Sequence, residues 1–222
     1  MKEIFSMIKL VIFDLDGTLI NSIMDLADAT NYALRECGFT EHPVAKYNYF
    51  VGDGVNNLIL RAIPEDSRCD TMISKIKTLF SNYYIKHYSD KTYIYEGIIP
   101  LINNLKKKGL KLAVASNKPD QFTKEIITNL FGMGIFDFVQ GHKEGIPHKP
   151  DPRIIKEAMS FLAVSDKETV MIGDTNVDIK TGKNAGIRTI GCLWGFRDEL
   201  ELKEAGTDYI VSDPNEIIDI LM

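Results

Sequence analysis

Cysteine is scarce in this sequence. The 222 residues include only Cys37, Cys69 and Cys192. They are odd in number, lie far apart and show none of the spacings that bind zinc or form a thioredoxin-like pair. We therefore expect reduced, mostly buried thiols in a cytoplasmic protein.

Long apolar runs are also missing. No stretch approaches the roughly 18 consecutive apolar residues that a membrane-spanning helix needs. Residues 1–7 carry charges where a signal peptide would be apolar. The sequence thus predicts a soluble chain that is not exported and has no membrane partner. Because Met7 directly precedes the first predicted strand, residues 1–6 are expected to be a disordered extension or to mark an alternative start.

Positive charge is not concentrated anywhere in the chain. The 26 Lys and Arg residues are outnumbered by 31 Asp and Glu residues, which gives a net charge of −5. Without a basic block we expect no nucleic-acid partner. The 45% hydrophobic and 26% charged residues are close to the average of globular proteins, so disordered and fibrous classes are excluded. The length permits one compact unit or two small ones.

Strands and helices alternate over most of the chain. Residues 8–13 are continuously apolar and rich in β-branched side chains, as is typical of a strand buried on both faces of a parallel sheet. Further strands are predicted at residues 111–115, 136–140, 169–172, 188–192 and 209–211, with helices between them. This alternation implies right-handed crossovers. The predicted fold class is α/β, a Rossmann-like parallel sheet with helices on both faces.

One long segment interrupts the alternation. Residues 22–87 follow helical periodicity, with Ser22 as a predicted N-cap and Gly38 as a C-terminal stop. Eight of the nine tyrosines lie between Tyr32 and Tyr95. We therefore expect an inserted α-helical domain at residues 21–93 and an α/β core made of residues 1–20 and 94–222.

Polar side chains follow four of the predicted strands. They are Asp14 and Asp16, Ser116 with Asn117 and Lys118, His148 with Lys149, and Asp174 followed by Asp178. Ligands of open α/β sheets bind beyond these strand ends. A single strand-end aspartate is about as often a helix cap or turn former. A cluster of carboxylates, however, costs stability unless a cation compensates it, and oxygen ligands suit Mg²⁺. The cluster therefore predicts a divalent metal site.

A metal beside an amine and a hydroxyl indicates phosphate chemistry. Lys149 would share the negative charge with the metal, while Ser116 and backbone N–H groups would hold the remaining oxygens. The alternatives are a solvated loop lysine and simple helix capping by Ser116. Pro150 and Pro152 stiffen the loop that carries Lys149, which favours the functional interpretation.

Asp14 and Asp16 can divide the catalytic work. One carboxylate would attack phosphorus and form an aspartyl phosphate, while the other would act as general acid and then as general base. The metal favours ionisation of Asp14. A less compensated Asp16 would then hold a proton near neutral pH, which separates the two roles.

Four motifs in this sequence resemble those of the haloacid dehalogenase superfamily of phosphohydrolases. They are DLDGT at residues 14–18, VASNK at 114–118, HKPDP at 148–152 and GDTNVD at 173–178. The resemblance covers essentially the whole chain. It implies that Asp14 is the nucleophile and a metal ligand, that Asp16 is the acid/base and offers its backbone carbonyl to Mg²⁺, and that Asp174 is the remaining ligand.

The resemblance implies further roles. Ser116, Asn117 and Lys149 would bind the substrate, with Lys149 neutralising both the phosphoryl group and Asp14. Asp178 would hold Lys149 or a metal-bound water, and counts among the metal-site residues. The helical domain would be a mobile cap with hinges near residues 19–22 and 91–97, which excludes water and selects the substrate.

Two shorter segments resemble phosphoglycolate phosphatases. They are residues 50–61, from FVGDGV to Arg61, and the late WGF at residues 194–196. Gly52 and Gly54 flank a predicted helix start whose N–H groups would meet an anionic substrate, with Arg61 facing it. The alternative is that Asp53 caps this helix, while Arg61 is solvated. Trp194 is more often a packing residue than a ligand.

These observations favour one function. We expect a Mg²⁺-dependent phosphatase that acts on a small phosphorylated metabolite, with 2-phosphoglycolate as the leading substrate. Asp16 supports a phosphatase over a dehalogenase, because a leaving alkoxide needs a proton whereas a halide does not. A pyrophosphatase or a sugar phosphomutase remains the alternative, followed by a non-catalytic regulatory protein. Either a monomer or a homodimer is compatible with the sequence.

Overall fold

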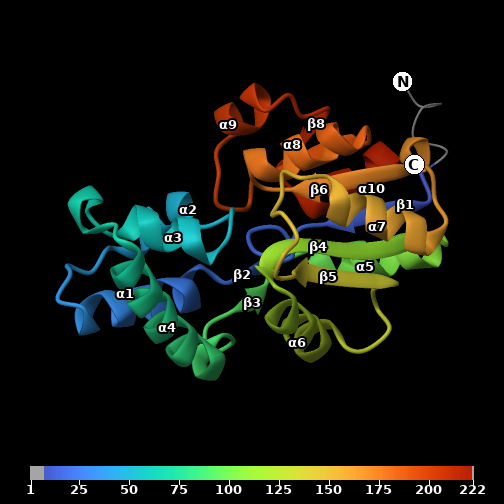
Figure 1. Cartoon of the computed structure of the whole chain (residues 1–222). Coiled ribbons are helices and arrows are strands. Elements are labelled where there is room, and N and C mark those ends of the chain that lie inside the picture. Colours follow the sequence, from blue (N-terminus) through green and yellow to red (C-terminus); the bar gives the residue numbers. More distant parts are fainter. Residues whose placement is uncertain (1–7, 222) are drawn as a thin grey trace. The chain divides into compact units, whose positions relative to one another are not determined.

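The computed structural model describes residues 8–221 and divides into two compact units (Figure 1). One unit is Asn21–Tyr93, and the other combines the described residues up to Ile20 with those from Ile94 onward. The chain passes between the units at two short strands, β2 (Ile20–Asn21) and β3 (Tyr93–Ile94), which pair with each other. The extension expected at residues 1–6 lies outside the described residues.

The larger unit contains a sheet of six strands. Their order is β5-β4-β1-β6-β7-β8, and every pairing is parallel. The strands are β1 (Leu10–Phe13), β4 (Lys111–Pro119), β5 (Phe138–His142), β6 (Thr169–Gly173), β7 (Arg188–Cys192) and β8 (Tyr209–Val211). The predicted α/β fold class with a parallel sheet is confirmed.

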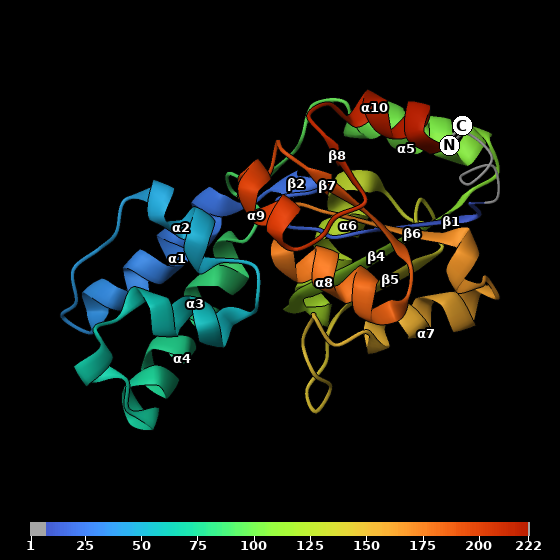
Figure 2. The same cartoon turned by 90° about the horizontal axis from the view of Figure 1, so that it is seen from above.

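Helices cover both faces of this sheet. Figure 2 shows α5 (Ile98–Lys107) and α10 (Pro214–Leu221) together on one face, and α7 (Arg153–Leu162) and α8 (Asn176–Ala185) on the other. The remaining elements of the unit are α6 (Asp120–Phe131), which contacts β4 and β5, the 3-10 turn η3 (Asp166–Glu168) and α9 (Glu199–Glu204). This two-sided cover explains why the strands consist of apolar runs.

The central strand β1 lies in the apolar core of the α/β unit. All four of its residues are buried. Leu10 and Ile12 join Ile155 of α7 in one apolar cluster. Phe13, the residue after Ile12, faces the other side, where its ring meets Phe136 edge to face at 6.5 Å between centroids. Each such buried side chain contributes roughly 1.5–3 kcal/mol. The anchored strand delivers the chain rigidly to Asp14.

Several predicted strand boundaries are wrong, including the start of β1, which is Leu10 rather than residue 8, and the end of β5, which is His142 rather than residue 140. β4 continues to Pro119, four residues beyond the predicted end at Ala115, and β5 begins at Phe138 rather than at residue 136. The pairing of β4 with β5 shifts register between Ala115 and Pro119. The prediction followed the apolar run and stopped where it turned polar. Beyond the apolar run, Asn117 bonds to the Lys149 backbone and Lys118 pairs with Asp16.

The smaller unit consists mainly of helices. They are α1 (Ile23–Glu36), α2 (Val44–Phe50), α3 (Val55–Ala62), the 3-10 turn η2 (Glu65–Ser67) and α4 (Asp70–His87). Ser22 stands at the predicted N-cap position of α1 but makes no side-chain cap hydrogen bond, whereas Asn21 Oδ1 accepts from the Ile23 N–H at 3.2 Å. Gly38 follows the helix with a φ of +78°, as predicted for a C-terminal stop. Tyr47 and Tyr84 are almost fully buried. Packing within the unit therefore accounts for part of its tyrosine content.

The three cysteines are free thiols in different environments. Cys192 is buried, Cys37 is half-buried and Cys69 is exposed. The expectation of mostly buried thiols is therefore wrong, because Cys69 stands at the solvent-exposed start of α4. Among the described residues, no helix combines the length and the apolar character that crossing a membrane requires.

Candidate functional site

Three carboxylates from two neighbouring strand ends form one cluster. Asp14 follows β1, Asp174 follows β6, and Asp178 lies in the first turn of α8. One oxygen from each lies within 4.8 Å of the others. The three residues are at most 5% exposed. The parallel pairing of β1 with β6 brings them together, because it places the carboxyl ends of both strands at one edge.

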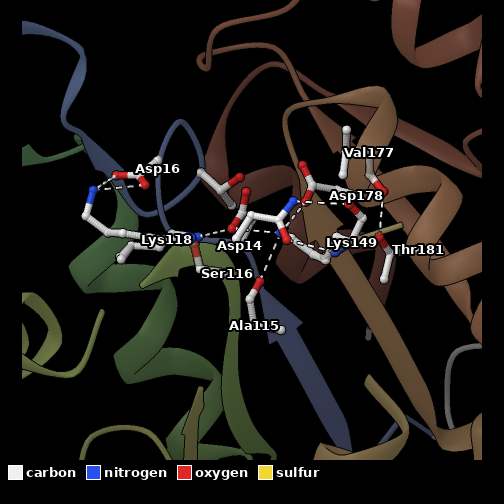
Figure 3. A network of polar contacts seen from close by, with 12 residues as sticks. Asp14, Asp16, Ala115, Ser116, Lys118, Lys149, Val177, Asp178 and Thr181 are labelled. Atoms are coloured by element: carbon white, nitrogen blue, oxygen red, sulfur yellow. Dashed lines mark hydrogen bonds and ion pairs between the residues drawn. The ribbon is translucent and has the colours of Figure 1, made fainter. Parts of the chain in front are cut away.

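Lys149 places an ammonium group inside this cluster. Its Nζ lies 2.9 Å from Asp14 Oδ1 and 2.7 Å from Asp178 Oδ1, and it donates to the carbonyl oxygen of Ala115 at 3.0 Å (Figure 3). The Lys149 side chain is only 1% exposed. The alternative of a solvated loop lysine is therefore excluded.

The electrostatics of the cluster leave it short of positive charge. Burial and the neighbouring Asp178 raise the pKa of Asp14 well above its usual range, although Lys149 opposes this shift. Burial and Asp178 raise the pKa of Asp174 to about 7. Burial alone would lower the pKa of Lys149, but Asp14 and Asp178 outweigh it and raise the pKa. Three buried carboxylates around one ammonium match the oxygen donor set of a hard divalent cation.

Asn117 holds the backbone of Lys149 from both sides. Its Oδ1 accepts from the Lys149 N–H at 2.7 Å, and its Nδ2 donates to the Lys149 carbonyl oxygen at 3.2 Å. Asn117 is 7% exposed. The motif resemblance implies that Asn117 binds the substrate, whereas these two bonds fix the loop that carries Lys149. Its own contact with a substrate stays a prediction.

Ser116 lies on β4, the strand that pairs with β1 on the other side from β6. It is buried, and its Oγ accepts from the Lys118 N–H at 3.2 Å. Helix α6 begins at Asp120, and the residue that precedes it is Pro119. Ser116 is thus too early in the chain to cap α6, so the capping alternative is wrong.

Lys118 belongs to this site, although the sequence predicts no role for it. Its Nζ lies 3.0 and 3.1 Å from the two carboxylate oxygens of Asp16, and its side chain is 3% exposed (Figure 3). The expectation that Asp16 is the less compensated carboxylate is therefore wrong. The only available signal was a lysine next to Ser116 at a strand end. The pairing itself depends on the extended course of β4.

Asp174 also has partners that the sequence did not reveal. Thr18 Oγ1 donates to Asp174 Oδ1 at 3.1 Å, and the Phe196 N–H donates to Oδ2 at 2.8 Å. Trp194 Nε1 donates to the carbonyl oxygen of Thr18 at 3.0 Å. These hydrogen bonds give Trp194 a polar contact in addition to packing. In the sequence, the only signs of these contacts are the WGF segment and Thr18, the final residue of DLDGT.

Gly52 and Arg61 lie in the helical unit. Arg61 Nη1 and Nη2 each lie 2.6 Å from one oxygen of Asp53, and Nη1 also donates to the Phe50 carbonyl oxygen at 2.9 Å. The N-cap of α3 is Gly54, with a φ of +92°, so the expected capping by Asp53 is wrong. Asp53 instead pairs with Arg61. A contact of Gly52 or Arg61 with substrate stays a prediction.

Comparison with known proteins agrees with this geometry. Residues 11–192 match the family described as haloacid dehalogenase-like hydrolase. The chain is 30% identical to the phosphoglycolate phosphatase of Aquifex aeolicus and 31% identical to that of Psychrobacter arcticus, with 96% of each chain covered.

The fold has close structural counterparts. A candidate phosphoglycolate phosphatase from Lactobacillus delbrueckii subsp. bulgaricus superimposes with a TM-score of 0.92 at 33% identity, covering 96% of this chain and 98% of the other. The match extends over both described units. The chain therefore belongs to the haloacid dehalogenase-like hydrolase family and is a hydrolase similar to phosphoglycolate phosphatases.

Proposed function

We propose that this chain is a Mg²⁺-dependent phosphatase that hydrolyses a small phosphate monoester, with 2-phosphoglycolate as the leading substrate. The observation that carries the proposal is the buried Lys149 ammonium, 2.9 Å from Asp14 and 2.7 Å from Asp178. A cation fixed beside a buried carboxylate is suited to an anionic substrate that this carboxylate attacks. The named relatives support the choice of substrate.

The buried carboxylates fit Mg²⁺, which prefers oxygen ligands. We assign Asp14, the backbone carbonyl of Asp16 and Asp174 as ligands, with Asp178 adjacent as the partner of Lys149. When bound, Mg²⁺ neutralises phosphate charge and supports the developing charge on the oxygens of phosphorus. It also compensates the carboxylates whose pKa burial raises.

The side chains then divide the reaction. Ser116 and Lys149 hold the phosphoryl group, and an ionised Asp14 oxygen attacks phosphorus. As the bond to the leaving oxygen breaks, Asp16 donates a proton to that oxygen, for which it must carry a proton in place of the ion pair with Lys118. Asp16 next accepts a proton from water that attacks the aspartyl phosphate, and this step releases phosphate and restores Asp14. Lys118, which pairs with Asp16 in this structure, orients that carboxylate.

The helical unit would determine which substrate the chain accepts. We propose that residues 21–93 act as a mobile cap, with hinges near 19–22 and 91–97. Gly52 and Arg61 would face the anionic end of the substrate, which suits the carboxylate of 2-phosphoglycolate. A pyrophosphatase or a sugar phosphomutase would use the same α/β site with a differently shaped cap.

A substrate panel tests the proposal. Phosphate release is measured with Mg²⁺ on 2-phosphoglycolate, sugar phosphates, nucleotides and pyrophosphate, with Asp14→Asn as the inactive control. Asp151→Asn is the matched control, because Asp151 is paired with Arg153 at the surface. A sharp preference for 2-phosphoglycolate supports the substrate. A preference for pyrophosphate, or conversion of β-glucose 1-phosphate to its isomer, would replace it. Activity that persists in Asp14→Asn would overturn the mechanism.

A further inference from the structure

Both oxygens of the Asp174 carboxylate are held by hydrogen bonds. The residue is 0% exposed. Each of its oxygens accepts a hydrogen bond from outside the acidic cluster, Oδ1 from Thr18 Oγ1 at 3.1 Å and Oδ2 from the Phe196 N–H at 2.8 Å. A carboxylate oxygen has two lone-pair sites, so one acceptor site on each oxygen is left for a cation.

The two donors are themselves connected. Trp194 Nε1 donates to the Thr18 carbonyl oxygen at 3.0 Å, which ties the segment after β7 to the turn after β1. β6 lies between β1 and β7 in the sheet, and Asp174 directly follows β6. Residues 194–196 therefore meet the β1 turn across the end of β6. Asp174 therefore accepts hydrogen bonds from the segments that follow the two strands beside β6, namely β1 and β7.

Two glycines allow the backbone to approach Asp174 closely. A methyl group added to Gly17 would overlap the Asp174 carboxylate, and one added to Gly195 would overlap Asp174 Cβ and the Gly17 carbonyl oxygen. Gly17 also has a φ of +86°, which disfavours any other residue. At Gly195 the close approach alone demands glycine. The carboxylate thus sits in a slot that two glycines leave open.

We propose that residues 194–196 and Thr18 form a positioning clamp that fixes the Asp174 carboxylate and thereby sets the Mg²⁺ affinity of the site. The inference rests on the proposed function, because it takes Asp174 as a metal ligand. Groups that hydrogen-bond to metal ligands orient them and contribute strongly to affinity. The clamp residues are positioning residues, since their described bonds lead to Asp174 and Thr18.

The clamp also gives WGF a role that its sequence alone did not specify. Trp194 supplies the indole donor, Gly195 permits the close approach, and Phe196 supplies a peptide N–H. The first two requirements depend on the residue type. The third does not, because any residue except proline has this N–H. This difference makes a matched control available within the same segment.

Isothermal titration of Mg²⁺ alone into the full chain tests the clamp. Thr18→Val removes the hydroxyl donor and should weaken Mg²⁺ binding roughly tenfold, while Thr18→Ser retains the donor and should restore it. Trp194→Phe keeps an aromatic ring but removes the indole donor, and should weaken binding about threefold, since it acts through Thr18. Gly195→Ala should weaken binding most, because the carboxylate must move.

The control variant is Phe196→Leu. It loses packing but keeps the peptide N–H, so its melting temperature should fall while its Mg²⁺ affinity stays at the wild-type value. As a second readout, the Mg²⁺ concentration at half-maximal phosphate release should rise in Trp194→Phe. Its kcat at saturating Mg²⁺ should be retained.

The outcomes separate the clamp from the proposed function. Saturable binding by the wild type with unchanged affinity in Thr18→Val and Trp194→Phe would overturn the clamp alone. An equal loss in Phe196→Leu would also overturn it, because packing would then explain the effect. A wild-type chain that binds no Mg²⁺ would contradict both the clamp and the metal dependence. If Gly195→Ala does not fold, the other variants still decide the question.

Discussion

The two units of this chain differ in how many charged side chains they bury. The α/β unit buries four ionisable side chains around one point, namely Asp14, Lys149, Asp174 and Asp178. In the helical unit the described buried residues are mostly apolar, with Tyr47 and Tyr84 among them, and Asp25 is the one buried carboxylate. The described ion pairs of this unit lie at the surface: Arg35 with Glu41, Arg61 with Asp53, Arg68 with Glu65, His87 with Asp90, and Lys91 with Asp28.

This contrast separates chemistry from stability. Burying a charge is expensive and often weakens a fold, so a buried charged cluster indicates a functional need. Exposed ion pairs contribute typically 0–1 kcal/mol. Changes at the strand ends should therefore affect turnover more than stability. Changes in the helical unit should affect stability or substrate affinity while leaving the chemical step intact.

The strongest test removes the nucleophile charge. Asp14→Asn should lower kcat roughly 10³-fold or more, because an amide cannot form the aspartyl phosphate. Its melting temperature should be unchanged or higher without metal, since one buried carboxylate is removed. Phosphate release and thermal unfolding measure the two effects. A parallel loss of both would break the separation between chemistry and stability.

The next largest effect is expected at Asn117. Asn117→Ala removes both bonds to the Lys149 backbone and should lower kcat roughly 10–100-fold by misplacing the ammonium. Asn103→Ala, at an exposed position on α5, is the matched control. Steady-state kinetics with 2-phosphoglycolate provides the measurement. If the two variants had equal kcat values, Asn117 would be a structural residue only.

The pH dependence of stability tests the buried charges directly. The folded-state pKa of Asp174 is about 7, against a usual value of 3.8. Between these values the folded chain holds a proton that the unfolded chain has lost, so this stabilising contribution fades as pH rises towards 7. Asp174→Asn should remove this slope and be more stable at pH 8 by roughly 2 kcal/mol.

Urea unfolding in a chelator at several pH values measures this effect. Asp14 should contribute in the same direction, because burial raises its pKa as well. Adding Mg²⁺ to the wild type should reverse the loss at high pH. An equal pH dependence of the free energy of unfolding in the wild type and in Asp174→Asn, both without metal, would contradict the prediction.

A smaller effect is expected at the one buried carboxylate described in the helical unit. Asp25 accepts from the Lys91 N–H at 3.0 Å and from Thr92 Oγ1 at 2.6 Å, and thus fastens the end of the unit to α1. Asp25→Asn should lower the free energy of unfolding by about 1–2 kcal/mol. Asp28→Asn, which breaks the exposed pair with Lys91, should cost less than about 0.5 kcal/mol. Denaturant titration of both variants compares buried and exposed carboxylates.

The smallest stability effect is expected at Arg61. Arg61→Gln and the control Arg35→Gln each break an exposed pair, and each should change the free energy of unfolding by less than about 1 kcal/mol. The Arg61 variant alone should raise the KM for 2-phosphoglycolate, by about tenfold for one lost charged hydrogen bond. Equal KM values would remove Arg61 from the proposed substrate contacts.

Much of the fold could be predicted because apolar runs and helix signals are local. The buried strand at residues 8–13 and the stop at Gly38 depend on near neighbours in sequence. The strand-end rule was sufficient to group Asp14 with Asp174 and Lys149. The sequence did not predict the hydrogen-bond partners of these side chains.

The missed contacts depend on three-dimensional detail. Lys118 reaches Asp16 only because β4 stays extended past its apolar run. Thr18 reaches Asp174 through a turn, and it lies far from Asp174 in sequence. The Arg61 pair with Asp53 required the loop before α3 to bring the carboxylate towards the last turn of that helix. No periodicity encodes such contacts.

The central place of β1 has a consequence for how the chain is made. β1 pairs with β4 and β6, and Leu10 lies opposite Lys111 and Thr169. Both partners are synthesised about one hundred or more residues after Leu10. Until then the apolar LVIF segment has no sheet partner. Such segments are prone to aggregation while exposed. The first strand should therefore complete its sheet only after the residues that surround the candidate site have been synthesised.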